Sequence, residues 1–488
     1  MRATYLRTMD APRGLEPLFP DRDSDEPLGR QFARRLRHAI ESGLYDPGSR
    51  LLPSRELARR LGLSRNTVTA AIEQLSAEGY LESRVGSGTF VVANVVRPAG
   101  PAAASPRALP VAAERLLSAD ALLSGYAMGE GPLRAGVPDP AAFPFAAWTR
   151  CTRRALAELP ESLDYADSRG DKRLREAIVQ HVQQFRGVSA EAYRVIVVEG
   201  AQAAIRLVND VLLSDGDAAV VEDPTYPFAR ASLEARNVRL EPVPVDGDGL
   251  DARLAPPARV ALVSPSHQFP LGATMSLERR HALLAWAHAN DAYVIEDDYD
   301  SEYAFDGKPL PSLQSIDREE RVLYVGTFSK TLAPALRLGY LIVPRHLAEI
   351  FAVARTLATM GGTRFVQATL AEFLAGGYFA RHVRRMTAIY GERRATLVRL
   401  YEEGLRGAGF RLGAANAGLH LTVIGPAGFD DIAVTDELRR EGVRVQPLSA
   451  FCVARSDCRG FVVGYSAAPM PQIEHAARAV FRVAARRV

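Results

Sequence analysis

Lys330 is the side chain of this sequence best placed for covalent chemistry with an aldehyde. It ends the stretch Gly-Thr-Phe-Ser-Lys at residues 326–330, directly after the apolar run of residues 322–325. Such a run predicts a buried parallel strand, and a deprotonated amine that follows it could attack a phosphorylated aldehyde. Ser329 and Arg337 supply a hydroxyl and a cation nearby. A Ser-Lys pair alone is more often part of an ordinary loop, so this interpretation depends on other sites.

A second site, at Gly200, has the pattern of a phosphate-binding turn. The apolar residues 195–198 predict a strand that continues through Gly200 into a helix beginning near Ala201 and Gln202. Free backbone N–H groups at the start of a helix bind phosphate. Glycine turns between strands and helices are common, so this pattern is weak by itself.

Two further stretches offer aromatic and polar groups. The prolines of Asp-Pro-Thr-Tyr-Pro at residues 223–227 predict a rigid loop that could lay Tyr226 flat against an aromatic ring. Residues 263–272 form a polar turn with Pro and Gly that contains His267. A single histidine is more often structural than catalytic, and we assign His267 no chemistry.

Acidic residues gather where another predicted strand ends. The apolar residues 292–295 lead into five carboxylates between residues 296 and 302, among them Asp297. Buried carboxylates are costly unless cations or metal ions balance them. Two interpretations stay open here: a magnesium or calcium site, or one carboxylate that pairs with a protonated pyridine nitrogen.

Taken in chain order, these sites are the parts that pyridoxal phosphate requires. Lys330 would form the Schiff base, Asp297 would keep the pyridine nitrogen protonated, and Tyr299 would donate to the phenolic oxygen. Ser329, Arg337 and the N–H groups of residues 200–202 would hold the phosphate. The predicted cofactor-binding residues are Gly200, Ala201, Gln202, Tyr226, Asp297, Tyr299, Ser329, Lys330 and Arg337.

Composition indicates a soluble protein of several domains. The 488 residues exceed one ordinary domain, and 47% hydrophobic with 24% charged residues is normal for a globular chain. The three cysteines form no Cys-x-x-Cys pair, which argues against disulfides or a zinc site, and we predict no bound metal. The chain begins without the apolar segment of a signal peptide and has no long apolar run, so we expect a cytoplasmic protein without membrane contact.

The first ninety residues have the pattern of a nucleic-acid reader. Residues 1–27 are polar and contain several Pro and Asp, so we expect a flexible arm. Phe32, Leu36, Ile40 and Leu44 recur every four residues, as on one face of a helix.

Two short helices are then predicted on either side of a glycine turn. The second begins with Ser-Arg-Asn-Thr at residues 64–67, and residues 79–91 predict a hairpin wing that turns at Gly86. This arrangement is how a helix-turn-helix enters a major groove. Residues 28–85 contain ten positive and six negative side chains, which is modest support for binding to nucleic acid.

Residues 28–92 resemble the winged helix-turn-helix domain of the GntR family. The match rests on Leu-Pro-Ser-Arg-Glu-Leu-Ala at residues 52–58 and Leu-Gly-Leu-Ser-Arg-Asn-Thr-Val at residues 61–68. The resemblance implies a DNA-binding domain; the alternative is a helical pair that docks a protein. Pattern and resemblance together predict DNA contacts from Arg55, Ser64, Arg65, Asn66, Thr67 and Gly86.

The rest of the chain consists of a linker and a larger body. Residues 93–130 are rich in Ala, Pro and Ser and predict a semi-rigid linker. From Gly136 onwards strand-like runs alternate with helical patterns, which predicts an α/β fold with a mostly parallel sheet covered by helices.

Residues 131–488 resemble a fold-type-I aminotransferase. The match includes Gly-Val-Pro-Asp-Pro at residues 136–140, Phe143-Pro144, Gly170 with Leu174-Arg175, and Arg-Leu-Gly-Tyr at residues 337–340. The resemblance implies pyridoxal phosphate as cofactor and a small α+β subdomain beside the sheet. Residues 28–92 are called the head below, and residues 131–488 the body. Taken together, head and body make the whole chain resemble the MocR subfamily of GntR regulators.

Two positions depart from the aminotransferase pattern. Glu199 stands where relatives usually have Ser or Thr, so its side chain is expected to face away from the phosphate or to be paired. Val462 stands where an arginine commonly binds the substrate carboxylate, and Arg459 is the nearest replacement. The second departure weakens the case for an ordinary α-amino acid as ligand.

We expect a transcription regulator whose body senses an amine, an amino acid or pyridoxal phosphate itself, without sustained turnover. The alternative is a working aminotransferase that also binds DNA. The resemblance implies a homodimer in which each head crosses to the other body, and therefore an operator with paired half-sites.

Overall fold

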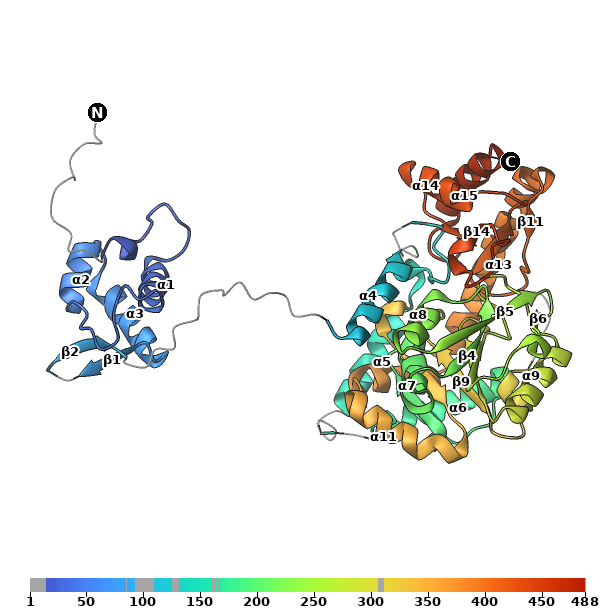
Figure 1. Ribbon diagram of the computed structural model, residues 1–488, viewed down its shortest axis with the longest axis horizontal. Coiled ribbons are helices and arrows are strands. Elements are labelled where there is room, and N and C mark those ends of the chain that lie inside the picture. Colours follow the sequence, from blue (N-terminus) through green and yellow to red (C-terminus); the bar gives the residue numbers. More distant parts are fainter. Residues whose placement is uncertain are drawn as a thin grey trace. The chain divides into compact units, whose positions relative to one another are not determined.

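The chain folds into two units, Met1–Ala108 and Leu109–Val488 (Figure 1). The computed structural model describes residues 15–84, 86–92, 109–124, 131–158, 164–165, 167–305 and 311–487. The division between the units falls inside the stretch that the sequence predicts as a linker. No helix within these ranges is long and apolar enough to cross a membrane.

The described part of the first unit contains three α-helices and a hairpin, besides a short 3₁₀ helix. These elements are α1 (Leu28–Glu41), α2 (Ser54–Leu61), α3 (Arg65–Ala77), β1 (Leu81–Arg84) and β2 (Gly88–Val91). The apolar spacing buries Phe32 and Leu36 of α1 together with Val68 and Leu75 of α3. Leu44, expected on the same face as Phe32, is 48% exposed because α1 has already ended at Glu41.

Residues 15–27 pack onto this unit and do not form the flexible arm that their composition predicts. The short helix η1 (Glu16–Leu18) places Leu15 and Leu18 in the same core as α1. The buried side-chain amide of Gln31 donates to the carbonyl oxygens of Asp21 and Glu26 at 2.9 and 2.7 Å. The burial of two leucines and the hydrogen bonds of one amide thus order this segment in spite of its polar composition. Residues 1–14 of the predicted arm lie outside the described residues.

Part of the predicted linker is a helix of the second unit. Residues Val111–Ser124 form α4, which packs against α8 (Pro227–Ala235). The side chain of Arg115 also reaches Asp215, with Nη1 and Oδ2 3.4 Å apart. The prediction fails here because fourteen residues without Pro or Gly, mostly Ala and Leu, favour a helix. Residues 93–108 and 125–130 lie outside the described residues.

The second unit is built on an eight-stranded sheet in the order β3-β10-β9-β8-β7-β4-β5-β6. Its strands are β3 (Val195–Val198), β4 (Ala218–Asp223), β5 (Arg239–Asp246), β6 (Gly249–Leu250), β7 (Val260–Val263), β8 (Tyr293–Asp298), β9 (Val322–Thr327) and β10 (Gly339–Ile342). Neighbours from β9 to β5 are parallel, whereas β10 is antiparallel to β3 and β9, and β6 to β5. This sheet confirms the predicted α/β class.

Helices cover both faces of the sheet (Figure 1). Ile196 and Val198 pack with α7 (Ala201–Leu212), α8 and α11 (Ala348–Thr359), whereas Val195 and Val197 face α6 (Lys172–Arg186) and α12 (Arg364–Ala375). The layer that contains α6 and α12 also includes α5 (Phe145–Ala157), α9 (Leu277–Ala289) and α10 (Leu313–Ile316). Strands buried on both faces explain the continuous apolar runs of the sequence.

The expected small α+β part follows the large sheet. Its four-stranded antiparallel sheet has the order β11-β12-β14-β13. The elements are α13 (Tyr378–Gly404), β11 (Arg411–Leu412), β12 (His420–Ile424), α14 (Asp431–Arg440), β13 (Gln446–Pro447), β14 (Gly460–Gly464) and α15 (Met470–Ala485).

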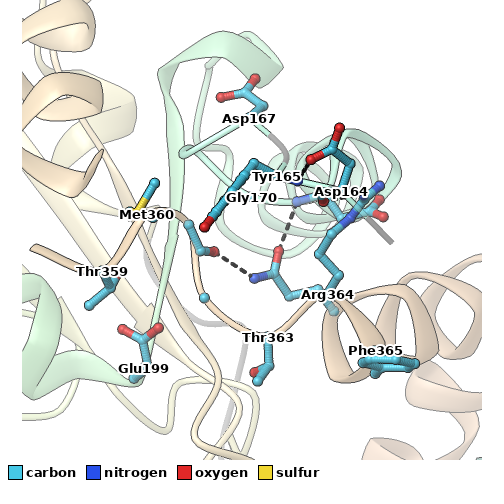
Figure 2. A pocket seen from close by; sticks show the side chains of 14 residues that line it. Asp164, Tyr165, Asp167, Gly170, Glu199, Thr359, Met360, Thr363, Arg364 and Phe365 are labelled. Atoms are coloured by element: carbon cyan, nitrogen blue, oxygen red, sulfur yellow. Dashed lines mark hydrogen bonds between the residues drawn. The ribbon is translucent and has the colours of Figure 1, made fainter. Parts of the chain in front are cut away.

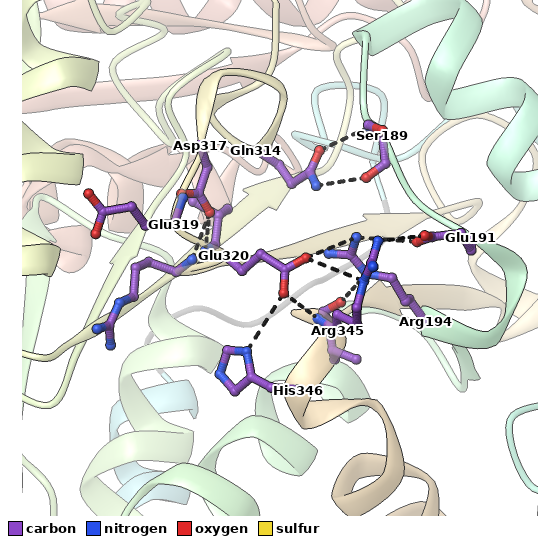
Figure 3. Close-up of polar contacts among 12 residues, drawn as sticks. Ser189, Glu191, Arg194, Gln314, Asp317, Glu319, Glu320, Arg345 and His346 are labelled. Carbon is purple, nitrogen blue, oxygen red and sulfur yellow. Dashed lines mark hydrogen bonds and ion pairs between the residues drawn. The ribbon is translucent and has the colours of Figure 1, made fainter.

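Ion pairs fasten the edge of the large sheet where β3 and β9 begin and β10 ends (Figure 3). Arg194 donates to the carbonyl oxygen of Val343 at 2.8 Å and lies 3.5 Å from Glu320. Arg345 pairs with Glu191 at 2.8 Å. The opposite edge, at the carboxyl ends of the parallel strands, is the usual place for a ligand in an open α/β sheet.

Candidate functional site

One cavity of about 150 Å³ gathers the residues that the sequence predicts around the cofactor. It lies where β8 and β9 end and α7 begins. All the predicted cofactor residues line it: Gly200, Ala201, Gln202, Tyr226, Asp297, Tyr299, Ser329, Lys330 and Arg337. Six further lining residues were not predicted from the sequence to bind the cofactor, namely Ala135, Gly136, Val137, Phe269, Thr327 and Pro334. Gly136 and Val137 belong to a motif already visible in the sequence.

The turn after β9 positions Lys330. Phe328 is buried, and its N–H donates to the carbonyl oxygen of Leu338 at 3.0 Å. The N–H of Ser329 donates to Thr327 Oγ1 at 3.2 Å. A side chain at Gly136 would crowd the amine, since a Cβ there would lie 3.2 Å from Lys330 Nζ. The small residue therefore leaves space in front of the amine.

Burial shifts the proton equilibrium of Lys330 toward the neutral amine. Removal from water lowers the pKa of its amine, while the carboxylates of Asp300 and then Asp297 act in the opposite direction. A lowered pKa increases the neutral fraction, which is the form that attacks a carbonyl carbon.

The structure separates the acidic residues at the end of β8 by their partners. Asp298 pairs with Arg186 at 2.7 Å and accepts from the Tyr324 hydroxyl. Glu296 accepts from the N–H groups of Leu313 and Gln314 at 2.7 and 2.9 Å. These acids are bound to separate protein groups, so they do not converge on one metal site.

Asp297 differs from its neighbours because one of its oxygens, Oδ1, is buried without a hydrogen-bond partner. Burial, and to a smaller degree the charge of Asp298, raise the pKa of Asp297 to about 7, although Lys330 acts in the opposite direction. An unpaired buried carboxylate oxygen beside a cavity fits a cationic or N–H partner that the protein itself does not supply.

A second part of the cavity has the form of a phosphate cradle. Gly200 precedes the first residue of α7 with φ 90°, and no side chain caps the helix. Gly339 permits close approach, since a Cβ there would lie 2.8 Å from the Cα of Gly200. Arg337 adopts a left-handed backbone (φ 50°), and its guanidinium donates to the carbonyl oxygen of Glu199 at 2.7 Å. Free N–H groups, a helix start and an arginine suit a phosphate.

The Glu199 side chain is paired, as expected. Its two carboxylate oxygens accept from Arg355 of α11 at 2.7 and 2.9 Å. The Arg355 side chain is 3% exposed and that of Glu199 is 37% exposed. Arg355 thus balances the negative charge of Glu199, which would otherwise stand unpaired beside the phosphate cradle.

Aromatic rings form a further wall. The Phe269 ring lies 5.9 Å from both the Tyr226 and the Tyr299 rings, edge to face in each case. The loop of Tyr226 is held because the N–H of Thr225 donates to Phe451 O at 2.9 Å. Burial raises the pKa of the Tyr299 hydroxyl above its usual value, so it stays a proton donor.

His267 has more contacts than the sequence indicated. Its Nδ1 lies 3.0 Å from the Tyr299 hydroxyl and 3.0 Å from Asp300 Oδ1. His267, Asp300 and His420 each place one possible metal-ligand atom within 4.8 Å of the other two. Their distance in the sequence gave no indication of this spacing. Asp300 also accepts from Leu419 N–H at 3.2 Å, and His420 Nε2 lies 3.0 Å from Pro270 O. These are the contacts of a buried hydrogen-bond network behind Tyr299.

The residues around this cavity fit pyridoxal phosphate. The unpaired oxygen of Asp297 suits a protonated ring nitrogen, the start of α7 with Arg337 suits the phosphate, and Lys330 suits the aldehyde.

A larger hollow of about 700 Å³ is lined in part by Glu199 (Figure 2). It is lined by Asp164, Tyr165 and the segment around Met360 and Arg364. The Tyr165 residue is 80% exposed. None of the predicted cofactor residues lines this hollow.

In the first unit, the predicted DNA-contacting residues lie at the start of α2, at the start of α3 and in the wing. Arg55, Arg65 and Asn66 are exposed, and the exposed Gly86 (φ 75°) lies between β1 and β2. Ser64 caps α3, because its Oγ accepts from the Thr67 N–H at 3.0 Å. Ser64 and Thr67 thus fix the helix start as well as standing at the expected interface.

The sequence and the fold both match known proteins. Residues 133–480 match the family Aminotransferase class I and II, and residues 28–91 match the bacterial regulatory proteins of the gntR family. The chain is 37% identical over 463 residues to the probable rhizopine catabolism regulatory protein MocR of Rhizobium meliloti, with 92% of each chain covered.

Two further similarities extend this result. The chain is 32% identical over 462 residues to the HTH-type pyridoxine biosynthesis transcriptional regulator PdxR of Corynebacterium glutamicum, covering 93% and 94% of the two chains. An archaeal alanine:glyoxylate aminotransferase superposes with a TM-score of 0.69 and 25% identity, covering 78% of this chain and 96% of its own.

Proposed function

Because the chain belongs to the MocR-type transcription regulators, with a gntR-family head and an aminotransferase-like body, we propose that it binds pyridoxal phosphate at Lys330 and regulates transcription accordingly. The observation that carries this proposal is the cavity in which Lys330, the unpaired Asp297 oxygen and the start of α7 meet. A small amine, an amino acid or the cofactor itself is the effector.

Each part of the cavity has a role toward the cofactor. The bound group supplies an electrophilic carbon and an electron-withdrawing ring. Lys330 provides the amine, and its lowered pKa keeps a larger fraction neutral. Asp297 holds a proton on the ring nitrogen, and Tyr299 donates to the phenolic oxygen. Arg337, Ser329 and the N–H groups of residues 200–202 orient the phosphate.

Two observations favour regulation over sustained turnover. Val462 replaces the expected carboxylate-binding arginine, and the chain carries a DNA-binding head. The second candidate, an active aminotransferase, is favoured by the complete set of lysine, aspartate and tyrosine around the cavity. Multiple turnovers with an amino acid and a keto acid would favour the enzyme; their absence from a cofactor-loaded protein favours the regulator.

We propose further that the body forms a homodimer and that each head crosses to the partner, as in the expected domain-swapped arrangement. Exposed apolar side chains support such an interface: Met360, which lines the hollow of Figure 2, is 56% exposed, and Leu357 of α11 is 84% exposed. Two heads on a dimer would read paired half-sites. Light scattering on the purified protein measures the oligomeric state.

The cofactor assignment is tested by reconstitution with pyridoxal phosphate. The wild type should gain a visible absorption band, and borohydride reduction followed by peptide mass analysis should place the cofactor on Lys330. Lys330→Ala should abolish the band, whereas Lys172→Ala, at an exposed lysine of α6, should keep it. A wild type that stays colourless with excess cofactor would contradict the assignment.

A further inference from the structure

The wall beside Lys330, where a substrate carboxylate would be expected, is apolar. Val462 of β14 is completely buried, and it packs in a cluster with Ala135, Phe269, Leu448 and Phe451. Ala135 and Phe269 of this cluster line the cavity. Tyr226 and Phe228 are partly buried against the same cluster. A charged group on this side would therefore lie against hydrocarbon and aromatic rings.

No cation that lines the described cavity faces this wall. The two lining cations are Lys330, which carries the chemistry, and Arg337, which is held against Glu199 O at the phosphate cradle. Arg459, the replacement suggested by the sequence, lies 3.6 Å from the buried Asp431 and does not line the cavity.

The two side chains whose charges act on the Lys330 amine are acidic. The carboxylates of Asp300 and Asp297 are both buried and both act on Lys330. A ligand carboxylate brought into this surrounding would be desolvated without a cationic partner. A ligand ammonium group would not carry that cost.

We propose that the cavity takes a primary amine with an apolar body and without a carboxylate or sulfonate group. The inference rests on the proposed function, since it names the effector class of the same site. The amine lies beside Lys330, and the apolar body packs against the wall formed by Phe269, Tyr226 and the Val462 cluster.

Matched ligands separate charge from size. The cofactor-loaded wild type is titrated by calorimetry with 3-methylbutylamine and leucine, and with 2-phenylethylamine and phenylalanine. Each amine should bind at least about tenfold more tightly than its amino acid. Leucinamide and phenylalaninamide, which keep the extra bulk without the negative charge, should recover most of the affinity.

A gain-of-charge variant tests the position itself. Val462→Arg should narrow or reverse the preference for amines over the matching amino acids, because the new guanidinium supplies a cationic partner for the ligand carboxylate. Leu254→Arg, at a residue 66% exposed, adds the same charge elsewhere and should leave the preference unchanged. Thermal unfolding and the visible band show whether Val462→Arg folds; if it does not, the wild-type ligand pairs decide alone.

The outcomes distinguish this inference from the proposal beneath it. A wild type without the visible band refutes the proposed function. A wild type with the band that binds the amino acids as well as the amines, or binds neither, overturns the effector class and leaves the cofactor assignment standing. Tighter binding of the amino acids would also point to a cation supplied by a second subunit.

Discussion

Asp297 gives the cofactor-free protein a pH dependence that can be measured. Its pKa is about 7 in the fold, against an ordinary value of 3.8, because burial penalises the charged carboxylate. Between these values the folded chain retains a proton that the unfolded chain has released. The free energy of unfolding therefore falls as pH rises through this window and levels off above pH 7.

We predict that Asp297→Asn removes this fall in the free energy of unfolding with rising pH. The apparent melting temperature of the cofactor-free variant should exceed that of the wild type above pH 7, with the difference vanishing near pH 4. Asp215→Asn, at a side chain 70% exposed, serves as the control and should show no such effect. An unchanged pH profile in Asp297→Asn would show that this carboxylate is ionised or paired in the fold.

Arg337 should matter for the cofactor more than for the fold. It is exposed, and its guanidinium lies at the start of α7, where a phosphate would bind. A charge-assisted hydrogen bond contributes about 1.5–3 kcal/mol, so Arg337→Ala should weaken cofactor binding roughly 10- to 150-fold. Titration of the visible band measures this affinity. Arg345→Ala, in the ion pairs of Figure 3, should leave it unchanged.

Residues with their own local pattern could be predicted, and residues that depend on distant contacts could not. Lys330 and Gly200 each follow a strand and Asp297 lies near the end of one, so the sequence indicated their place at one edge of a sheet. His267, Asp300 and His420 come from three separate segments, and only folding joins them behind Tyr299. Arg355 likewise gave no signal that it would pair with Glu199.

Among the elements, strands of a parallel sheet were visible because burial on both faces makes them continuously apolar. The reversed strand β10 was not, since an apolar run has no direction. Composition misled twice: α4 was assigned to a linker, and residues 15–27 to a flexible arm. In both cases a few leucines or good helix formers outweighed the average composition.

The pairing of Arg355 with Glu199 joins α11 to the turn before α7. Arg355→Ala would leave a carboxylate unpaired beside the phosphate cradle, although Glu199 is partly open to water. We expect a loss of about 1–3 kcal/mol in stability and weaker cofactor binding. Glu199→Gln with Arg355→Ala should recover part of the cofactor affinity, because it removes the stray negative charge. Chemical unfolding and the visible band measure the two effects; equal cofactor affinity in Arg355→Ala would contradict this role.

The helix-turn-helix makes a separate prediction. Arg65 is exposed at the start of α3 and is expected to contact DNA, so Arg65→Ala should abolish specific operator binding while keeping the visible band. Arg59→Ala is the matched control, because Arg59 of α2 already pairs with Glu56 at 2.6 Å. If the two variants bind an operator equally well, the start of α3 is not the reading surface.

At the scale of the whole molecule, a regulator needs the body's ligand to change the head's affinity for DNA. Such coupling is reciprocal, so DNA must change the affinity for the ligand by the same factor. It also requires that the ligand bind two conformations unequally. The chain provides the two units, Met1–Ala108 and Leu109–Val488, and the coupling between them can be measured.

The direct measurement is the affinity of the full chain for DNA from the upstream region of its own operon, with and without pyridoxal phosphate and a bound amine. We predict that occupancy of the cavity changes operator affinity by about fivefold or more. Lys330→Ala, which keeps the DNA-binding head, should lose this response. Equal operator affinity in the empty, cofactor-loaded and amine-bound wild type would contradict the claim that Lys330 belongs to a sensor.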